Sequence, residues 1–113
     1  MNTLTGLTGD APIGLEHYLV VAALMFVFGL MACLMRRNAI GILIGIELIL
    51  NASILNFMAF WRFHGGTTVE GPLFGLFIIL LAASEAAIAL AILLNMFFNF
   101  GSIDVDRAGQ MKR

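Results

Sequence analysis

The chain has 113 residues, 61% of them hydrophobic and 12% charged, with a formal net charge of −1. Soluble globular domains carry about 25% charged residues and about 45–50% apolar ones, so this composition excludes an ordinary soluble domain and predicts a single membrane domain over 1–113. The sequence has no basic patch and no glycine-rich phosphate loop, and we therefore expect no nucleic-acid partner. One cysteine, Cys33, excludes an internal disulfide.

The chain begins with a short polar leader, residues 1–14, and a first membrane helix is expected over about 16–35. No Lys or Arg precedes this helix. Arg36 and Arg37 follow it, where a cleaved signal peptide would have a small-residue cleavage site. We therefore expect the segment to remain in the mature chain as its first span.

Two further apolar segments predict two more membrane helices. A turn at 36–38 leads to a helix over about 39–61, and a third helix is expected over about 71–100, before a polar tail, 102–113. Each segment is long enough, because a span takes roughly 20 residues. The first turn is so short that the first two helices must be antiparallel neighbours. The predicted fold class is an all-α membrane protein with three transmembrane helices.

The positions of Lys and Arg predict the orientation, because basic residues are enriched on the cytoplasmic side of membrane proteins. With three spans, the first turn and the C-terminal tail share a side. That side carries five basic residues, Arg36, Arg37, Arg107, Lys112 and Arg113, whereas the other side carries only Arg62. We therefore expect the N-terminus outside and the C-terminus in the cytoplasm.

Two glutamates lie inside the predicted spans. Glu47 lies about nine residues beyond the Arg36–Arg37 turn, which is roughly 12–15 Å deep at about 1.5 Å per residue and close to the bilayer midplane. Glu85 is equally central in the third span. An ionisable group at this depth usually faces protein or water and marks an ion or proton path. Both are candidate proton-binding groups; the alternative is a protonated, hydrogen-bonded structural carboxyl.

Small residues gather on particular faces of the second and third helices. Glu47 and Asn51 share one face of the second helix, and the opposite face is rich in small residues. The positions expected to pack closely against other helices are Gly41, Gly45, Ala52, Gly75, Ala82 and Ala89. Neither face of the second helix suits lipid. We therefore expect other membrane subunits on both of its faces and on the small face of the third helix, with packing in a homo-oligomer as the alternative.

Three residues are candidates for supporting roles. Asn51 could hold a water or orient Glu47, or simply join two helices, and the sequence favours neither. Arg36 and Arg37 are interpreted as topology anchors, with proton supply or gating as the alternative.

No set of His, Cys or carboxylate residues has metal-ligand spacing, and no nucleophile is paired with a base, so we expect no catalytic, metal or cofactor-binding residue in this chain.

Several motifs of the chain resemble those of a known family. The segments Met35–Asn38, Leu43–Ser53 and Ala82–Ala91, with the Ser102–Asp104 start of the tail, are similar to subunit K of bacterial NADH:quinone oxidoreductase, or respiratory complex I, whose mitochondrial counterpart is subunit 4L. The resemblance covers about residues 14–106. Two departures, Ser84 in place of a common alanine and Gly71-Pro72-Leu73 at the start of the third helix, leave both carboxylates in place.

The resemblance implies a three-helix subunit in the membrane arm of a proton-translocating enzyme of the bacterial inner membrane. Glu47 and Glu85 would belong to a central hydrophilic axis and relay protons, and the subunit itself would be non-catalytic. The resemblance also implies NADH, FMN, iron–sulfur clusters and quinone on other subunits, with none bound by this chain.

Other functions compete with this interpretation. A related small subunit occurs in multisubunit sodium/proton antiporters. A stand-alone small proton-coupled transporter usually has four spans with its carboxylate in the first, and a rotor-type proton carrier of an ATP synthase has two spans with one carboxylate. A structural spacer leaves two intramembrane charges unexplained.

Overall fold

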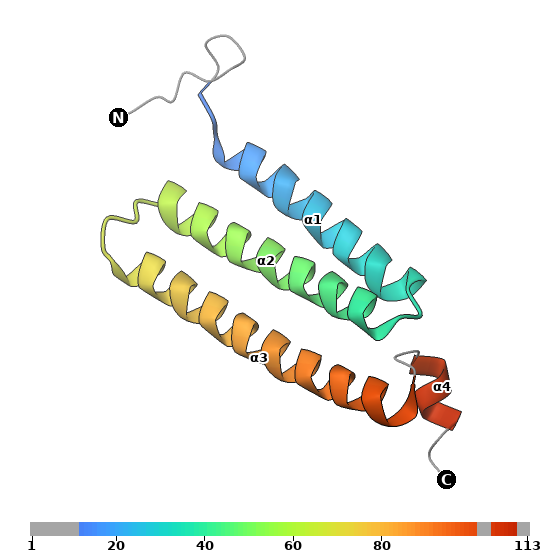
Figure 1. The fold of residues 1–113 in the computed structure, drawn as a ribbon. Helices are drawn as coiled ribbons and strands as arrows, with labels where there is room; N and C mark the ends of the chain where they lie inside the picture. Colours follow the sequence, from blue (N-terminus) through green and yellow to red (C-terminus); the bar gives the residue numbers. More distant parts are fainter. Residues whose placement is uncertain (1–11, 102–104, 111–113) are drawn as a thin grey trace.

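The computed structural model describes residues 12–101 and 105–110, and its regular structure there is helical. Three long helices confirm the predicted three-span, all-α class (Figure 1). The elements, in chain order, are α1 (Leu15–Met35), α2 (Ala39–Phe63), α3 (Glu70–Phe100) and α4 (Val105–Gln110). α1, α2 and α3 have 21, 25 and 31 residues, and each is long and apolar enough to cross a membrane.

Local chemistry fixes where the helices begin and end. The Asn38 side-chain oxygen accepts a hydrogen bond from the Ile40 N–H at 2.9 Å, which caps the first turn of α2 directly after the two arginines. At the other end of the chain, α3 ends at Gly101, whose φ of 68° lies in the left-handed region that glycine adopts without strain. The Gly101 N–H donates to the Phe97 carbonyl at 2.8 Å and completes this cap.

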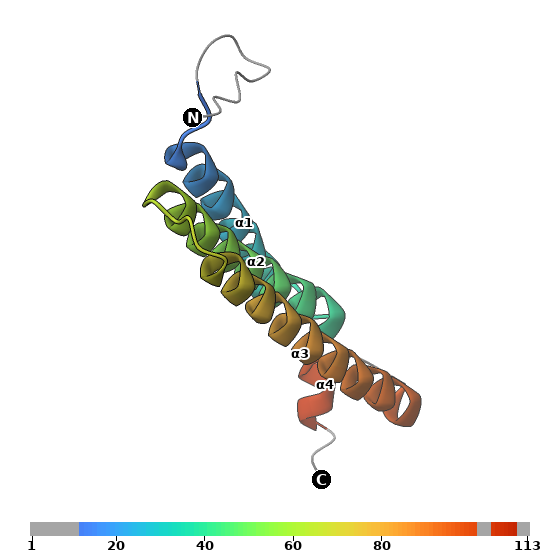
Figure 2. The same ribbon diagram turned by 90° about the vertical axis from the view of Figure 1, so that its left-hand side faces the viewer.

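The three long helices lie in a row, with α2 between α1 and α3 (Figure 1). Seen from the edge in Figure 2, they overlap into a thin layer, and the principal extents are 62 × 29 × 18 Å. Such a layer leaves most large apolar side chains on its surface, for example Leu34 at 77% exposed and Phe98 at 79%. In a bilayer this apolar surface is available to lipid and to other membrane proteins.

The contact between α1 and α2 is a close approach of two backbones. A Cβ added at Gly45 would lie 2.8 Å from the Gly29 carbonyl oxygen and 2.7 Å from the Cys33 sulfur. The reverse holds at Gly29, where an added Cβ would lie 2.8 Å from the Gly45 carbonyl oxygen. Buried alanines continue this contact toward the α2–α3 loop: Ala22, Ala52 and Ala59. The small residues therefore bring the two helix axes close together.

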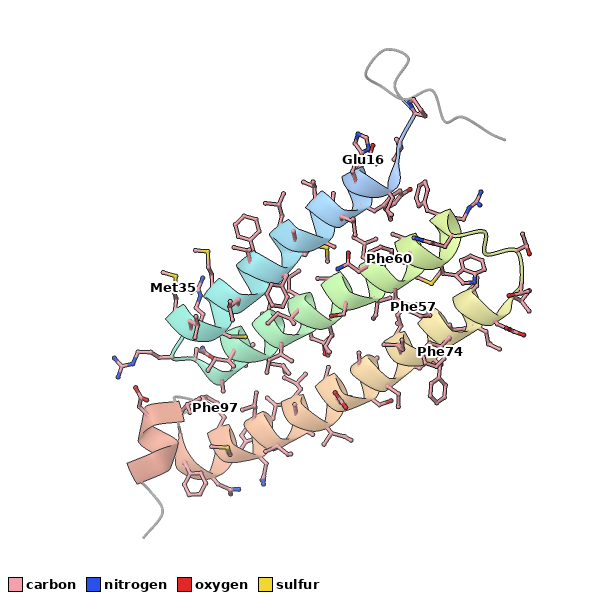
Figure 3. All side chains as sticks on the ribbon, turned by 180° about the vertical axis from the view of Figure 1, so that it is seen from behind. Glu16, Met35, Phe57, Phe60, Phe74 and Phe97 are labelled. Atoms are coloured by element: carbon pink, nitrogen blue, oxygen red, sulfur yellow. The ribbon has the colours of Figure 1, made fainter. Side chains whose placement is uncertain are left out.

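The contact between α2 and α3 uses larger side chains of α2 against glycines of α3. An added Cβ at Gly75 would lie 2.7 Å from the Met58 sulfur, and one at Gly71 would meet the Trp61 ring. The rings of Phe57 and Phe74 lie 5.4 Å apart between the two helices (Figure 3). Ile54 and Ala82 are buried further along the same two helices.

These contacts give the small residues neighbours within the chain. The sequence predicts other subunits at Gly45 and Gly75, whereas the structure places α1 against Gly45 and Met58 of α2 against Gly75. The physical reason is that short turns fold each helix back on the next, so the small residues of one helix meet the adjacent helix first. Gly41 is covered by the aliphatic stem of Arg36, whose Cγ would lie 3.1 Å from an added Cβ.

The tail contains a short helix, α4, where the sequence indicates only a polar segment. Residues 1–11 of the predicted leader, 1–14, lie outside the described residues, as do the tail residues 102–104 and 111–113 and the side chain of Arg107. The basic residues Lys112 and Arg113, which enter the orientation argument, therefore remain sequence-based evidence.

Candidate functional site

Glu47 lies on the side of α2 that faces α3. It precedes the buried Ile54 by seven residues, which is about two helical turns, so the two side chains leave α2 in nearly the same direction. Met58 and Trp61, which contact α3, lie on the same side of α2. Glu47 is half-buried. The fold therefore places this carboxyl at the seam between two helices of its own chain.

The pairing of α2 with α3 places Glu85 at the same level as Glu47. The two helices are antiparallel, and Met58 lies against Gly75. Counting eleven residues back from Met58 reaches Glu47, and counting eleven forward from Gly75 reaches Ala86, next to Glu85. The two intramembrane carboxylates therefore lie at similar depth on neighbouring helices.

Glu85 lies at the edge of the α3 surface that faces α2. Ala82, three residues before it, is buried, and Ala89, four residues after it, is half-buried, whereas Glu85 itself is exposed. Within residues 12–101 and 105–110, neither glutamate has a hydrogen-bond or ion-pair partner. Both carboxyl groups are therefore left to bind water or groups from another subunit.

The polar residues nearest in sequence do not bond to the two glutamates. Asn51 is exposed one turn beyond Glu47 on α2. The Ser84 hydroxyl, adjacent to Glu85, donates to the Leu80 carbonyl at 2.8 Å in its own helix. About three to four turns beyond Glu85, Asn99 donates to the Asn95 side-chain oxygen at 2.8 Å. None of these amide and hydroxyl groups forms a hydrogen bond with Glu47 or Glu85. They add further polar atoms to the membrane-spanning helices.

Asn56 is a polar residue whose burial the sequence did not reveal. Its side-chain oxygen is buried and accepts no hydrogen bond from the described residues. The sequence places Asn56 on the small-residue face with Ala52 and Ala59, which the structure buries. An amide on a helix face of small residues is the signal that could have identified this buried polar group. Such an amide is unusual, because a buried acceptor without a donor is costly.

The two arginines of the first turn have different surroundings. Arg37 forms an ion pair with Asp106 at 2.9 Å, whereas Arg36 lies with its stem over Gly41. The sequence pattern does not distinguish Arg36 from Arg37 and assigns no role to Asp106. The pair joins residues 69 positions apart, and local sequence patterns do not predict such a contact.

The described residues include no group of three His, Cys, Asp or Glu side chains that could hold a metal ion. Cys33 is a free thiol that donates weakly to the Ile42 carbonyl at 3.7 Å within the α1–α2 contact. Among the described residues, the α2–α3 seam therefore offers two carboxyl groups as its ionisable side chains.

The fold and this seam define a class: a multi-pass membrane protein of three helices with paired intramembrane carboxylates. Comparison with known proteins identifies the family within that class. The family described as NADH-ubiquinone/plastoquinone oxidoreductase chain 4L matches residues 17–113, and the chain belongs to this family.

Individual relatives support the same assignment. NADH-quinone oxidoreductase subunit K of Chlorobaculum parvum is 49% identical over 100 residues, covering 88% of this chain and 93% of the relative. Subunit K 1 of Syntrophobacter fumaroxidans is 44% identical over 112 residues, 99% of both chains. The chloroplastic NAD(P)H-quinone oxidoreductase subunit 4L of Chara vulgaris is 46% identical over 98 residues, covering 87% of this chain and 98% of the relative.

Proposed function

We propose that this chain is a membrane-arm subunit of a proton-translocating NADH:quinone oxidoreductase in a bacterial inner membrane, and that Glu47 and Glu85 pass protons within it. The observation that supports this proposal is the placement of two carboxyl groups, without partners among the described residues, at one level of the α2–α3 seam. A carboxyl that only held helices of this chain together would be hydrogen-bonded to one of them, because an unpaired polar group inside a membrane is costly.

Proton transfer between these carboxyls requires intervening water. Helices in contact have axes about 8–10 Å apart, so side chains at one level of two helices are too far apart for a direct hydrogen bond when they do not point at each other. One or two waters would bridge Glu47 and Glu85. A carboxylate accepts hydrogen bonds and a protonated carboxyl donates one, so either group can take a proton from a bridging water or pass one to it.

Asn51 has the chemistry to support this transfer. Its amide both donates and accepts hydrogen bonds, so it can hold a water near Glu47 without adding a charge. In the proposal the chain moves protons only, and NADH, FMN, iron–sulfur clusters and quinone belong to other subunits. The chain is thus a non-catalytic subunit of a redox-driven translocase.

The exposed polar residues of α3 favour a protein partner there. Glu85, Asn95 and Asn99 are exposed in the chain on its own, within a helix otherwise rich in Leu, Ile and Phe. Polar groups facing hydrocarbon are costly, whereas a second subunit or a water-filled space between subunits satisfies them. We propose that the membrane subunits of the complex cover this surface.

The experiment that tests the proposal is recovery of the native assembly. An affinity tag on the chain, expressed from its own locus, should co-purify membrane subunits and an NADH-oxidising module that reduces quinone. Co-purification with antiporter subunits alone, without NADH:quinone activity, would support the sodium/proton antiporter alternative and contradict the proposal.

A further inference from the structure

The chain carries an ion pair that the proposed proton path does not use. The Arg37 guanidinium donates from Nε and Nη2 to one carboxylate oxygen of Asp106, at 3.1 and 2.9 Å. Next to it, the Val105 N–H donates to the Arg37 carbonyl at 3.4 Å. Side chain and backbone therefore both connect the α1–α2 turn to α4.

This connection lies at the opposite end of α3 from the contacts that α3 makes with Met58 and Trp61 of α2. At the end near the α2–α3 loop, α3 is held against α2 by the ring pair Phe57–Phe74 and by the glycines over Met58 and Trp61. At the opposite end, α3 leads to α4, which lies beside the α1–α2 turn (Figure 1). Glu47 and Glu85 lie between these two attachments.

We propose that Arg37 and Asp106 are positioning residues: their ion pair holds the α4 end of α3 against the α1–α2 turn and so keeps Glu85 at the level of Glu47. The functional consequence rests on the proposed proton transfer, whereas the structural consequence does not. Loss of the pair would free one end of α3 to tilt or slide, and the number of waters between the two carboxyls would change.

The exposure of the pair sets the size of the expected effect. The side chains of Arg37 and Asp106 are 75% and 63% exposed, so water and salt screen the pair. Its loss should therefore change the ratio of docked to undocked α4 by up to about five-fold. The planar guanidinium fixes the direction of approach better than an ammonium would. We therefore expect a partial, salt-sensitive effect.

Cysteine cross-linking in the assembled membrane complex tests the structural part directly. In a Cys33→Ser background, Leu43→Cys with Ala89→Cys reports the α2–α3 spacing on the turn side of the glutamates, and Met58→Cys with Gly75→Cys reports it at the loop side. Both positions of the first pair are half-buried, and the α2–α3 pairing places them at the same level. Native gels check assembly of each variant.

Arg37→Gln or Asp106→Asn should slow cross-linking of the first pair about two- to five-fold and leave the second pair unchanged. Arg36→Gln is the matched control: it removes an equal charge from the same turn, and Arg36 has no ion-pair partner among the described residues. The reversed pair, Arg37→Asp with Asp106→Arg, should restore cross-linking toward the original rate.

Proton pumping by the same Arg37 and Asp106 variants should fall in proportion to cross-linking of the first pair and recover in the reversed pair. Unchanged cross-linking in Arg37→Gln, an equal effect of Arg36→Gln, or no recovery in the reversed pair would overturn the inference. Failure of the proposed function gives a different result. If Glu47 and Glu85 carried no protons, a Glu47→Gln, Glu85→Gln variant would pump fully. The cross-linking rates of the Arg37 and Asp106 variants, relative to the unchanged chain, would still fall as expected.

Discussion

At the residue scale, the two intramembrane glutamates differ in their surroundings. Glu47 is half-buried on the side of α2 that faces α3, whereas Glu85 is exposed at the edge of α3 beside small residues. Water reaches the neighbourhood of a small side chain more easily than that of a large one. The two carboxyls are therefore unequal partners, and substitutions at Glu47 should cost more than the same substitutions at Glu85.

Single substitutions test this inequality. Glu47→Gln should abolish most proton-coupled quinone reduction with the assembly intact, because the amide keeps the shape but does not titrate. Glu85→Gln should impair the reaction less, since water among the small residues offers a partial bypass. Quinone reductase rates in membrane vesicles measure both, and a larger loss in Glu85→Gln than in Glu47→Gln would reverse the assigned roles.

The carboxyl group itself, rather than the length of the side chain, should matter at Glu47. Glu47→Asp retains a titratable group, although one methylene shorter, and should keep a measurable part of the activity that Glu47→Gln loses. The comparison is made at equal amounts of assembled complex, quantified on native gels. Equal activity in Glu47→Asp and Glu47→Gln would indicate that titration at this position is irrelevant.

At the element scale, the sequence predicts the helices better than the contacts between them. Long apolar segments separated by Arg36–Arg37 and by a polar loop predict three spans, because each span depends only on local composition. α2 nevertheless continues past the predicted end near Trp61 to Phe63. The residues on one helix face do not identify the helix that packs against it. The neighbours of Gly45 and Gly75 are set by how the turns fold adjacent helices against each other.

Two features of the structure, an ion pair and a short helix, could not be predicted from the sequence. The ion pair between Arg37 and Asp106 joins residues of distant sequence position, and α4 forms in a tail whose composition indicates only polarity. Asn56 lies on the small-residue face of α2, and the structure buries its side-chain oxygen. The similar level of Glu47 and Glu85 was predictable, because each lies near the middle of its apolar segment.

The two glycine contacts should differ in their tolerance of an added methyl group. Gly45→Ala places a Cβ against the backbone of α1, which must move, and should destabilise the complex by about 1–3 kcal/mol. Gly75→Ala meets the flexible end of Met58, which can rotate away, and should cost less. Graded heating followed by native gels measures both, and equal tolerance would contradict the close α1–α2 contact.

At the scale of the whole molecule, the chain is a thin row of three helices with a largely apolar surface. α2 has neighbours on both sides within the chain, while the outer sides of α1 and α3 carry exposed apolar residues. The exposed Glu85 and the Asn95–Asn99 pair interrupt that surface on α3. Membership of the chain 4L family implies partner subunits of the NADH-quinone oxidoreductase complex.

The orientation of the chain is a further whole-molecule prediction. The excess of Lys and Arg at the α1–α2 turn and in the tail predicts a cytoplasmic C-terminus. A reporter fused after Arg113 should be active only if it functions in the cytoplasm, and a reporter at the N-terminus only if it functions outside. A C-terminal reporter active solely in the periplasm would contradict this orientation.

Proton pumping by the double variant Glu47→Gln, Glu85→Gln decides whether the two carboxyls carry protons. Membrane vesicles containing the assembled complex, verified on native gels, would be supplied with NADH and quinone while the proton gradient and the quinone reductase rate are recorded. We expect the double variant to assemble but to lose nearly all proton pumping. Full pumping by the assembled double variant would show that the two carboxyls are structural and that protons do not pass through them.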